Sequence, residues 1–275
     1  MSTPVIVGFD GSTAADAAVR HGAREAALRN ANLHIVHAFG WFPLLPPLYP
    51  PYNASEEGPR AAVLELLAQT AHGVRREWTD LVVSTRMVDG SPGAVLVEAS
   101  RGAQLIVVGH RGIGGFAGLL AGSTAMQVAS HASCPITVVR GAERPENTVI
   151  VLGMDGSPHG LAAAEVAFAN AERRSAELIV LHHVDASSDA QSDTVTAQVV
   201  QIARLHDDVQ YRHEAAEGPS AAAALIDAAN KFDAGMIVVG SRGHGGFRGL
   251  ITGSTSRALV EHAGCPVTVV PPAAG

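Results

Sequence analysis

The chain is built from one sequence pattern that occurs twice. The segment PVIVGFDGS, which begins at Pro4, returns as VIVLGMDGS from Val149. A longer segment beginning at Leu105 aligns without a gap with the one beginning at Met236. Repetition of this extent indicates two copies of one structural unit, and 275 residues leave room for two domains of ordinary size. We place the boundary in the polar GAERPENT stretch, which gives domains 1–143 and 148–275.

Within each copy, short apolar runs alternate with segments typical of helices. In the first copy the predicted strands cover residues 5–9, 33–38, 81–88, 105–108 and 136–139. The predicted helices are opened by Ser12 as N-cap, by Pro59, by Pro92, and by Ser123 as N-cap. Continuously apolar strands between helices indicate parallel sheets covered on both faces. The expected fold class is therefore α/β, with two tandem doubly wound five-stranded sheets in strand order 3-2-1-4-5.

In a doubly wound sheet, ligands bind beyond the carboxyl ends of the strands, where the direction of winding reverses. Here this point lies between the first and fourth strands of each copy. The first strands end at Asp10 and Asp155. The fourth strands lead into loops of the form G-x2-G-x9-G-S-T, which comprise Gly109, Gly112, Gly122, Ser123 and Thr124 in the first copy and Gly240, Gly243, Gly253, Ser254 and Thr255 in the second.

The chemistry of these loops favours a phosphate ligand. Glycines let backbone N–H groups approach an anion, and the helix that follows offers its N-terminus to phosphate. Arg111 and Arg242 lie inside the loops, where contact with phosphate and a plain surface position are equally good interpretations. His37 and His182 occupy matching places in the second strands, where a hydrogen-bonded core histidine is favoured over a ligand contact. A purely structural turn is the alternative for the glycines.

The loops, the D-G-S after the first strand and the C-P before the fifth resemble the ATP-binding branch of the universal stress protein family, over nearly the whole chain. The resemblance implies an adenine nucleotide alpha hydrolase-like fold and ATP as ligand, with Mg²⁺ as an optional companion. It implies that Asp10 and Asp155 hold the ribose, that the backbones of Ala38 and His183 meet adenine, and that the loop glycines and serines hold ribose and phosphates. A regulatory role in stress response or dormancy follows from it.

Composition narrows the alternatives. The net charge of −7 argues against nucleic acid as a partner. The Lys-containing P-loop motif is absent, and so are the phosphate motifs of nucleotidyl transferases and ATP pyrophosphatases. We therefore expect a binding protein rather than an enzyme, with slow ATP hydrolysis, or a scaffold with a vestigial site, as the alternatives. The N-terminus reads as a strand and no apolar run is long enough for a membrane span, so a cytoplasmic location without membrane association is expected.

The last strand of each copy is an apolar edge strand, at residues 136–139 and 267–270. The resemblance implies that these two strands pair antiparallel about a pseudo-two-fold axis within the chain, and it leaves a homodimer through another surface open. Cys134 and Cys265 would then lie far apart, so two free thiols are expected. For the Pro-rich aromatic segment 39–59, packing against its own domain is slightly favoured, and a cover over the adenine end of the first site or a contact with a partner are the alternatives. Because the second copy lacks this segment and carries His183 in place of Ala38, we expect its site to be more open and to bind less tightly.

Overall fold

The computed structural model describes residues 3–40, 57–113, 120–141, 148–184, 189–243 and 253–272. Its N-terminal half contains five strands: β1 (Val5–Gly8), β2 (Leu33–Phe39), β3 (Val83–Asp89), β4 (Leu105–Gly109) and β5 (Ile136–Val139). Its helices are α1 (Thr13–Leu28), α2 (Glu57–Glu77), α3 (Pro92–Ala99) with a 3₁₀ turn at Ser100–Gly102, and α4 (Ser123–His131). The predicted elements are all present, with ends that differ by a few residues.

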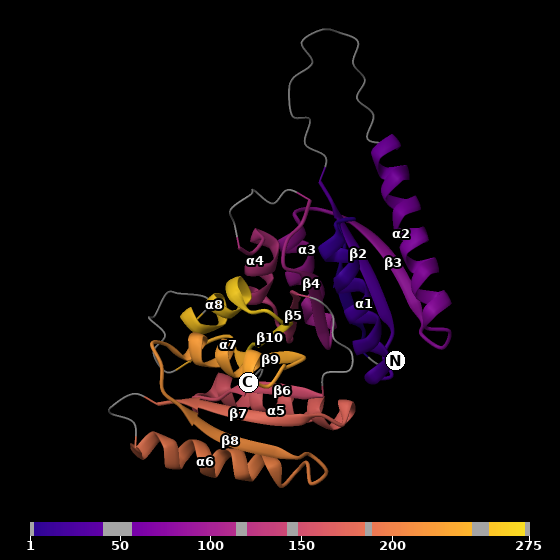
Figure 1. Cartoon of the computed structure of the whole chain (residues 1–275). Coiled ribbons are helices and arrows are strands. Elements are labelled where there is room, and N and C mark those ends of the chain that lie inside the picture. The colour runs from indigo at the N-terminus through magenta and orange to yellow at the C-terminus, as the bar shows by residue number, and fades with distance from the viewer. Residues whose placement is uncertain are drawn as a thin grey trace, which may run out of the picture.

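The C-terminal half repeats this order. Its strands are β6 (Val149–Gly153), β7 (Glu177–His183), β8 (Tyr211–Ala216), β9 (Met236–Gly240) and β10 (Val267–Val270). Its helices are α5 (Pro158–Arg174), α6 (Asp189–Ala203), α7 (Ala221–Lys231) and α8 (Ser254–His262). Figure 1 shows the two halves side by side, with β5 and β10 between them and with α2 and α6 at opposite ends.

All ten strands belong to one sheet, in the order β3-β2-β1-β4-β5-β10-β9-β6-β7-β8. Each half therefore has the predicted strand order 3-2-1-4-5, and the neighbours inside each half are parallel. The two halves meet through the antiparallel pair β5–β10, in which Thr137 lies opposite Thr268. The predicted intrachain pairing of the edge strands is confirmed. It removes from solvent the two apolar edges that would otherwise invite association.

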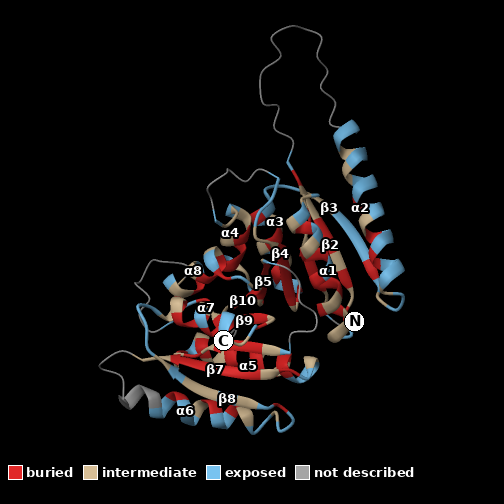
Figure 2. Ribbon diagram, viewed as in Figure 1, coloured by how far each residue is buried: buried red, intermediate tan, exposed pale blue. Residues whose placement is uncertain are grey.

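The apolar core lies in three parts. One part is shared by both halves and lies between the sheet and helices α3, α4, α7 and α8. The other two parts belong to single halves, one under α1 and α2 and the other under α5 and α6. Figure 2 shows the buried strands at the centre and the mostly exposed outer face of α2. The shared core makes the two halves one folded unit rather than two units joined by a linker.

Cys134 is buried, Cys265 is partly buried, and neither is in a disulfide bond, as predicted. In the described part of the chain, every helix is too short or too polar to cross a membrane. Most of the Pro-rich segment, residues 41–56, lies outside the described residues, and so does the predicted packing of that segment against its own domain.

Candidate functional site

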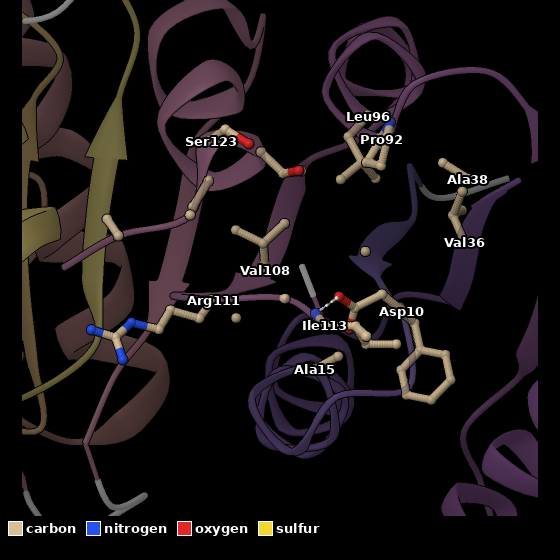
Figure 3. Close-up of a pocket in the computed structure, with 18 residues that line it drawn as sticks. Asp10, Ala15, Val36, Ala38, Pro92, Leu96, Val108, Arg111, Ile113 and Ser123 are labelled. Carbon is tan, nitrogen blue, oxygen red and sulfur yellow. Dashed lines mark hydrogen bonds between the residues drawn. The ribbon is translucent and has the colours of Figure 1, made fainter. Parts of the chain in front are cut away.

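A cavity of about 580 Å³ opens at the carboxyl ends of β1 and β4, the place where the winding of the N-terminal half reverses. Figure 3 shows its walls, which come from the ends of β1, β2 and β4 and from the first turns of α3 and α4. All eight residues that the sequence predicted for this half line the cavity: Asp10, Ala38, Gly109, Arg111, Gly112, Gly122, Ser123 and Thr124. The topology therefore brings the predicted residues together around one space that is large enough for a small ligand.

Asp10 ties the end of β1 to the loop that follows β4. Its Oδ1 accepts a hydrogen bond from the backbone N–H of Ser12 at 3.0 Å, and its Oδ2 accepts one from the N–H of Ile113 at 2.9 Å (Figure 3). A Cβ on Gly112 would lie 2.3 Å from that Oδ2, so any side chain at position 112 would displace the carboxylate from its hydrogen bonds. The identities of Asp10 and Gly112 therefore have a structural explanation, and contact of Asp10 with a ribose stays a prediction.

The same arrangement recurs in the C-terminal half. Asp155 Oδ1 accepts hydrogen bonds from the N–H of Ser157 at 3.0 Å and from its hydroxyl at 2.6 Å. A Cβ on Gly243 would lie 2.4 Å from Asp155 Oδ2. The remaining predicted residues of this half lie at matching places: His183 at the end of β7, Gly240 at the end of β9, Arg242 in the loop, and Gly253, Ser254 and Thr255 at the start of α8.

Close packing requires glycine at some positions of the loop and not at others. A Cβ on Gly109 would lie 2.6 Å from the carbonyl oxygen of Ala14, so close packing of β4 against α1 demands glycine there. Gly240 meets His159 of α5 in the same way, at 2.8 Å. Gly122 is different, because a Cβ there would meet no atom closer than 3.4 Å and its φ of −73° is open to any residue. Neither packing nor backbone strain explains glycine at position 122, which lines the cavity.

Helix α4 presents an N-terminus without a side-chain cap to the cavity. The predicted N-cap Ser123 is wrong: the cap is Gly122, whose carbonyl accepts the first helical hydrogen bond from Met126, and no side chain caps the turn. In contrast, Ser12 caps α1 and Ser157 caps α5 through their hydroxyls. The first N–H groups of a helix have no partner inside the helix and carry a partial positive charge. At α4 these groups are directed to the cavity, where an anion can bind them.

The opposite end of the cavity is apolar. Val36 and Ala38 of β2 face Pro92 and Leu96 of α3, and Val108 lies between them and the loop (Figure 3). The sequence did not single out Val36, Pro92 or Leu96 as site residues, because they read as ordinary core positions of a strand and a helix. Only the fold shows that they form one wall. The cavity therefore joins an apolar end to an anion-binding end.

Arg111 is exposed, and in Figure 3 its guanidinium points away from Asp10 and Ala38. Its charge acts on Arg140, which the sequence did not single out and whose pKa is lowered first by burial and then by Arg111. Arg140 donates to the carbonyl of Leu120, just before α4, at 2.8 Å, and to the carbonyls of Val260 and Ala263 at the end of α8, at 2.9 and 3.0 Å. Arg140 thus joins the cavity loop of one half to a helix end of the other, and its charge adds to burial in lowering the pKa of the neighbouring His110.

His37 and His182 do not lie on the cavity side of their strands. Leu178, Val180 and His182 are alternate residues of β7 and therefore share one face of the strand. Leu178 and Val180 belong to the core under α5 and α6, so His182 points to that core. His182 is 2% exposed, and burial, followed by the nearby His213, lowers its pKa. Its Nδ1 and that of His37 have no hydrogen-bond partner among the described residues. The predicted core position is confirmed for His182, whereas His37 is only half-buried, and a hydrogen bond of either ring stays a prediction.

Comparison with known proteins adds a family to this geometry. A profile described as the universal stress protein family matches residues 1–140 and again residues 146–271. A universal stress protein of Mycolicibacterium smegmatis is 33% identical over 98% of this chain and 97% of its own length. The universal stress protein Rv2005c of Mycobacterium tuberculosis is 31% identical over 96% of both chains. A crystal structure of a universal stress protein from Archaeoglobus fulgidus covers 99% of this chain and all of its own at a TM-score of 0.79, with 17% identity, which bears on the fold alone.

Proposed function

The chain belongs to the universal stress protein family in its tandem form, and on that premise we propose that it is a regulatory protein that binds ATP in the cavity of its N-terminal half. The observation that carries this proposal is the pairing of an apolar end with the uncapped N-terminus of α4 in one cavity of about 580 Å³. A nucleotide has the matching two parts, a flat apolar base and an anionic phosphate chain.

In this proposal the base lies between Ala38 and Leu96, and the phosphates lie against Gly122 and the first N–H groups of α4. The hydroxyls of Ser123 and Thr124 add donors to the phosphate end. Arg111 can reach the phosphates only by turning its side chain toward the cavity. Among the described residues, no group of three or more His, Cys, Asp or Glu is arranged to hold a metal ion. A Mg²⁺ ion would therefore come with the ATP phosphates, which is how this ion is usually bound.

We propose a role for occupancy of the site rather than for turnover, in keeping with a function in stress response or dormancy. In this role the protein would report the ATP level to a partner. Measurement of phosphate release from saturating ATP tests this point. The expected rate is below about one per minute, whereas typical enzymes turn over at about 1–10³ per second. A rate in the enzyme range would replace the regulatory proposal with hydrolysis.

The binding proposal is tested by Ser123→Glu, at the first position of α4. An acidic residue is favoured in the first turn of a helix, so the fold should tolerate the change. Its charge would repel phosphate, and we expect ATP affinity measured by calorimetry to fall at least tenfold, about 1.4 kcal/mol. The matched control is Ser123→Gln, which has the same shape without the charge and should lose much less affinity. Substitution of Gly112 is a poorer test, since any side chain there also displaces Asp10.

The choice of ligands for the titration follows from relatives. One universal stress protein from Archaeoglobus fulgidus has been solved in complex with dAMP, and another universal stress protein with cAMP. Each matches about half of this chain at a TM-score of 0.37, so they serve here only to extend the panel beyond ATP. Equal affinity for Ser123→Glu, Ser123→Gln and the unchanged protein would show that α4 does not hold the phosphates.

A further inference from the structure

The two halves match residue by residue along their second strands. Leu33 is paired with Val5 in the N-terminal half, and Leu178 is paired with Ile150 in the C-terminal half. Counting along β2 and β7 from these leucines, Ala38 corresponds to His183. At the position where β2 presents the methyl group of Ala38 to the cavity, β7 therefore carries the imidazole of His183.

The helices that face these strands match as well. Leu96 of α3 lies over Gly8, and Leu225 of α7 lies over Gly153, since a Cβ on either glycine would come within 2.7 or 2.8 Å of the leucine Cδ1. The walls of the apolar end therefore stand at the same places in both halves. What differs is the side chains that project from the strand between them.

Among the described residues of the N-terminal half, the cavity extends between the end of β2 and the start of α3. Ala38 and Pro92 both line the cavity, one from each side of this space (Figure 3). The proposed function places the adenine base here, because the other end of the cavity holds the loop and the N-terminus of α4. A base that enters this space passes between the strand end and the helix start.

In the C-terminal half, the half-buried side chain of His183 reaches from the end of β7 to the loop that leads into α7. Its Nε2 lies 3.1 Å from the carbonyl oxygen of Gly218, which follows β8 and precedes the N-cap Ser220 of α7. Leu181, two residues earlier, belongs to the core under α7, so His183 projects from the same face of β7 toward that helix. The hydrogen bond therefore holds the ring between the end of β7 and the loop before α7, at the position where the N-terminal half has the methyl group of Ala38.

A second difference between the halves reduces the space at the base end of the C-terminal site. Leu181 lies where the N-terminal half has Val36, and it adds one methylene group next to the imidazole. The phosphate end, in contrast, keeps its glycines: Gly253 caps α8 without a side-chain hydrogen bond, as Gly122 caps α4. The halves thus differ at the base end and agree at the phosphate end.

From these contacts we propose that His183, with Leu181 behind it, excludes the adenine base from the C-terminal half, so that each chain binds one adenine nucleotide. This inference rests on the proposed function and adds to it the number of sites, the half that holds the nucleotide and the residue that decides between them. It reverses the expectation that the second site is the more open one. The imidazole, rather than the lack of a Pro-rich segment, sets access to that site.

Calorimetric titration of the full chain with ATP tests the inference. We expect a stoichiometry of one for the unchanged protein and of two for the double variant His183→Ala, Leu181→Val. The reciprocal variant Ala38→His should weaken binding at the N-terminal site at least tenfold. His183→Phe is the matched control, because it keeps the bulk and loses the hydrogen bond to Gly218, and it should stay at one. Circular dichroism and thermal unfolding verify that each variant is folded.

Adding Ser123→Glu shows which half holds each site. In the unchanged background it should weaken the single site at least tenfold, and in the His183→Ala, Leu181→Val background it should weaken one of the two sites by that factor and leave the other unchanged. A stoichiometry of two in the unchanged protein, or of one in the double variant, would overturn the inference and leave the proposed function standing. Absence of ATP binding by every variant would overturn the proposed function, and the inference with it.

Discussion

The two halves carry the same residue at matching positions where β5 pairs with β10, and different residues at matching positions where α1 meets α5. At the strand pair, Thr137 and Thr268 lie opposite each other, and their hydroxyl oxygens are 2.8 Å apart. At the helix contact, Glu25 of α1 occupies the place that Asn170 holds on α5. Symmetric pairing thus sets the strand register, while the helix contact distinguishes one half from the other.

The helix contact is a buried charge cluster. Glu25 is fully buried and accepts hydrogen bonds from Arg29 of its own helix and from Arg174 of α5. Arg29 also donates to Asn170 Oδ1 at 2.8 Å, which completes a nearly symmetric arrangement. Burial lowers the pKa of each of the two arginines to about 10, so both stay charged at neutral pH. Two guanidinium groups therefore share one carboxylate, with His21 beside it.

The difference between Glu25 and Asn170 makes the pairing of halves directional. If two C-terminal halves met through this face, two copies of Arg174 would face two amides and would lack the carboxylate that now compensates them. Burial of an uncompensated charge is expensive. The duplicated sequence thus disfavours pairing between C-terminal halves of different chains, in addition to occupying the β10 edge within the chain.

The largest effect is expected from Glu25→Gln. Removal of one partner of a buried ion pair leaves the other charge uncompensated and costs about 3–5 kcal/mol of unfolding free energy. Denaturant unfolding followed by circular dichroism measures this cost. Glu172→Gln is the control, since Glu172 pairs with His206 with about half of its side chain exposed, and such changes usually stay within about 0.5 kcal/mol. Equal stabilities of the two variants would show that the cluster does not hold the halves together.

The matched change in the other half, Asn170→Asp, sharpens the comparison. It would give each arginine its own carboxylate, at a position where Arg29 already donates to the side-chain oxygen. We expect a gain in unfolding free energy at neutral pH rather than a loss. A clear loss would mean that the cluster is not short of negative charge, and that the amide of Asn170 has a packing role instead.

The next effect concerns the two threonines at the strand pair, which agree in sequence but differ in their partners. Thr268 also donates to the sulfur of Met236 at 3.4 Å, whereas the described hydrogen bond of the Thr137 hydroxyl is the one to Thr268. Thr268→Val leaves the buried Thr137 hydroxyl without that partner and should cost about 1–3 kcal/mol. Thr137→Val leaves Thr268 its sulfur acceptor and should cost less. A double variant as costly as the sum of both would contradict coupling between the two hydroxyls.

The sequence predicts the fold well because its strands are short, continuously apolar and repeated. It also predicts the loop residues of the first cavity, since their glycines and polar groups follow a strand end. The apolar wall from Val36 to Leu96 is not predictable in this way, because such residues are indistinguishable from core until α3 is placed against β2. The contact of Glu25 with Arg174 joins residues 149 positions apart, and no local pattern signals it. The sequence predicts Ser123 as the N-cap of α4 because serine is preferred there, whereas Gly122 is the N-cap in the structure.

The smallest effect distinguishes the two cysteines, which occupy matching places before β5 and β10. Burial raises the pKa of the Cys134 thiol to about 12, from an ordinary value of 9.0, so at about pH 8 the reactive thiolate is about a thousandfold scarcer than for an ordinary thiol. Cys265 is more exposed. With a disulfide reagent, we expect one thiol of the native protein to react within minutes and the second only on a much slower timescale. Cys265→Ser should remove the fast phase, whereas Cys134→Ser should leave it. In guanidinium chloride, two thiols should titrate together.

A native protein in which both thiols react at one rate would show that the strand pair opens often enough to expose Cys134. An unfolded protein with no titratable thiol would contradict the free state of both cysteines and, with it, the antiparallel pairing that keeps them apart.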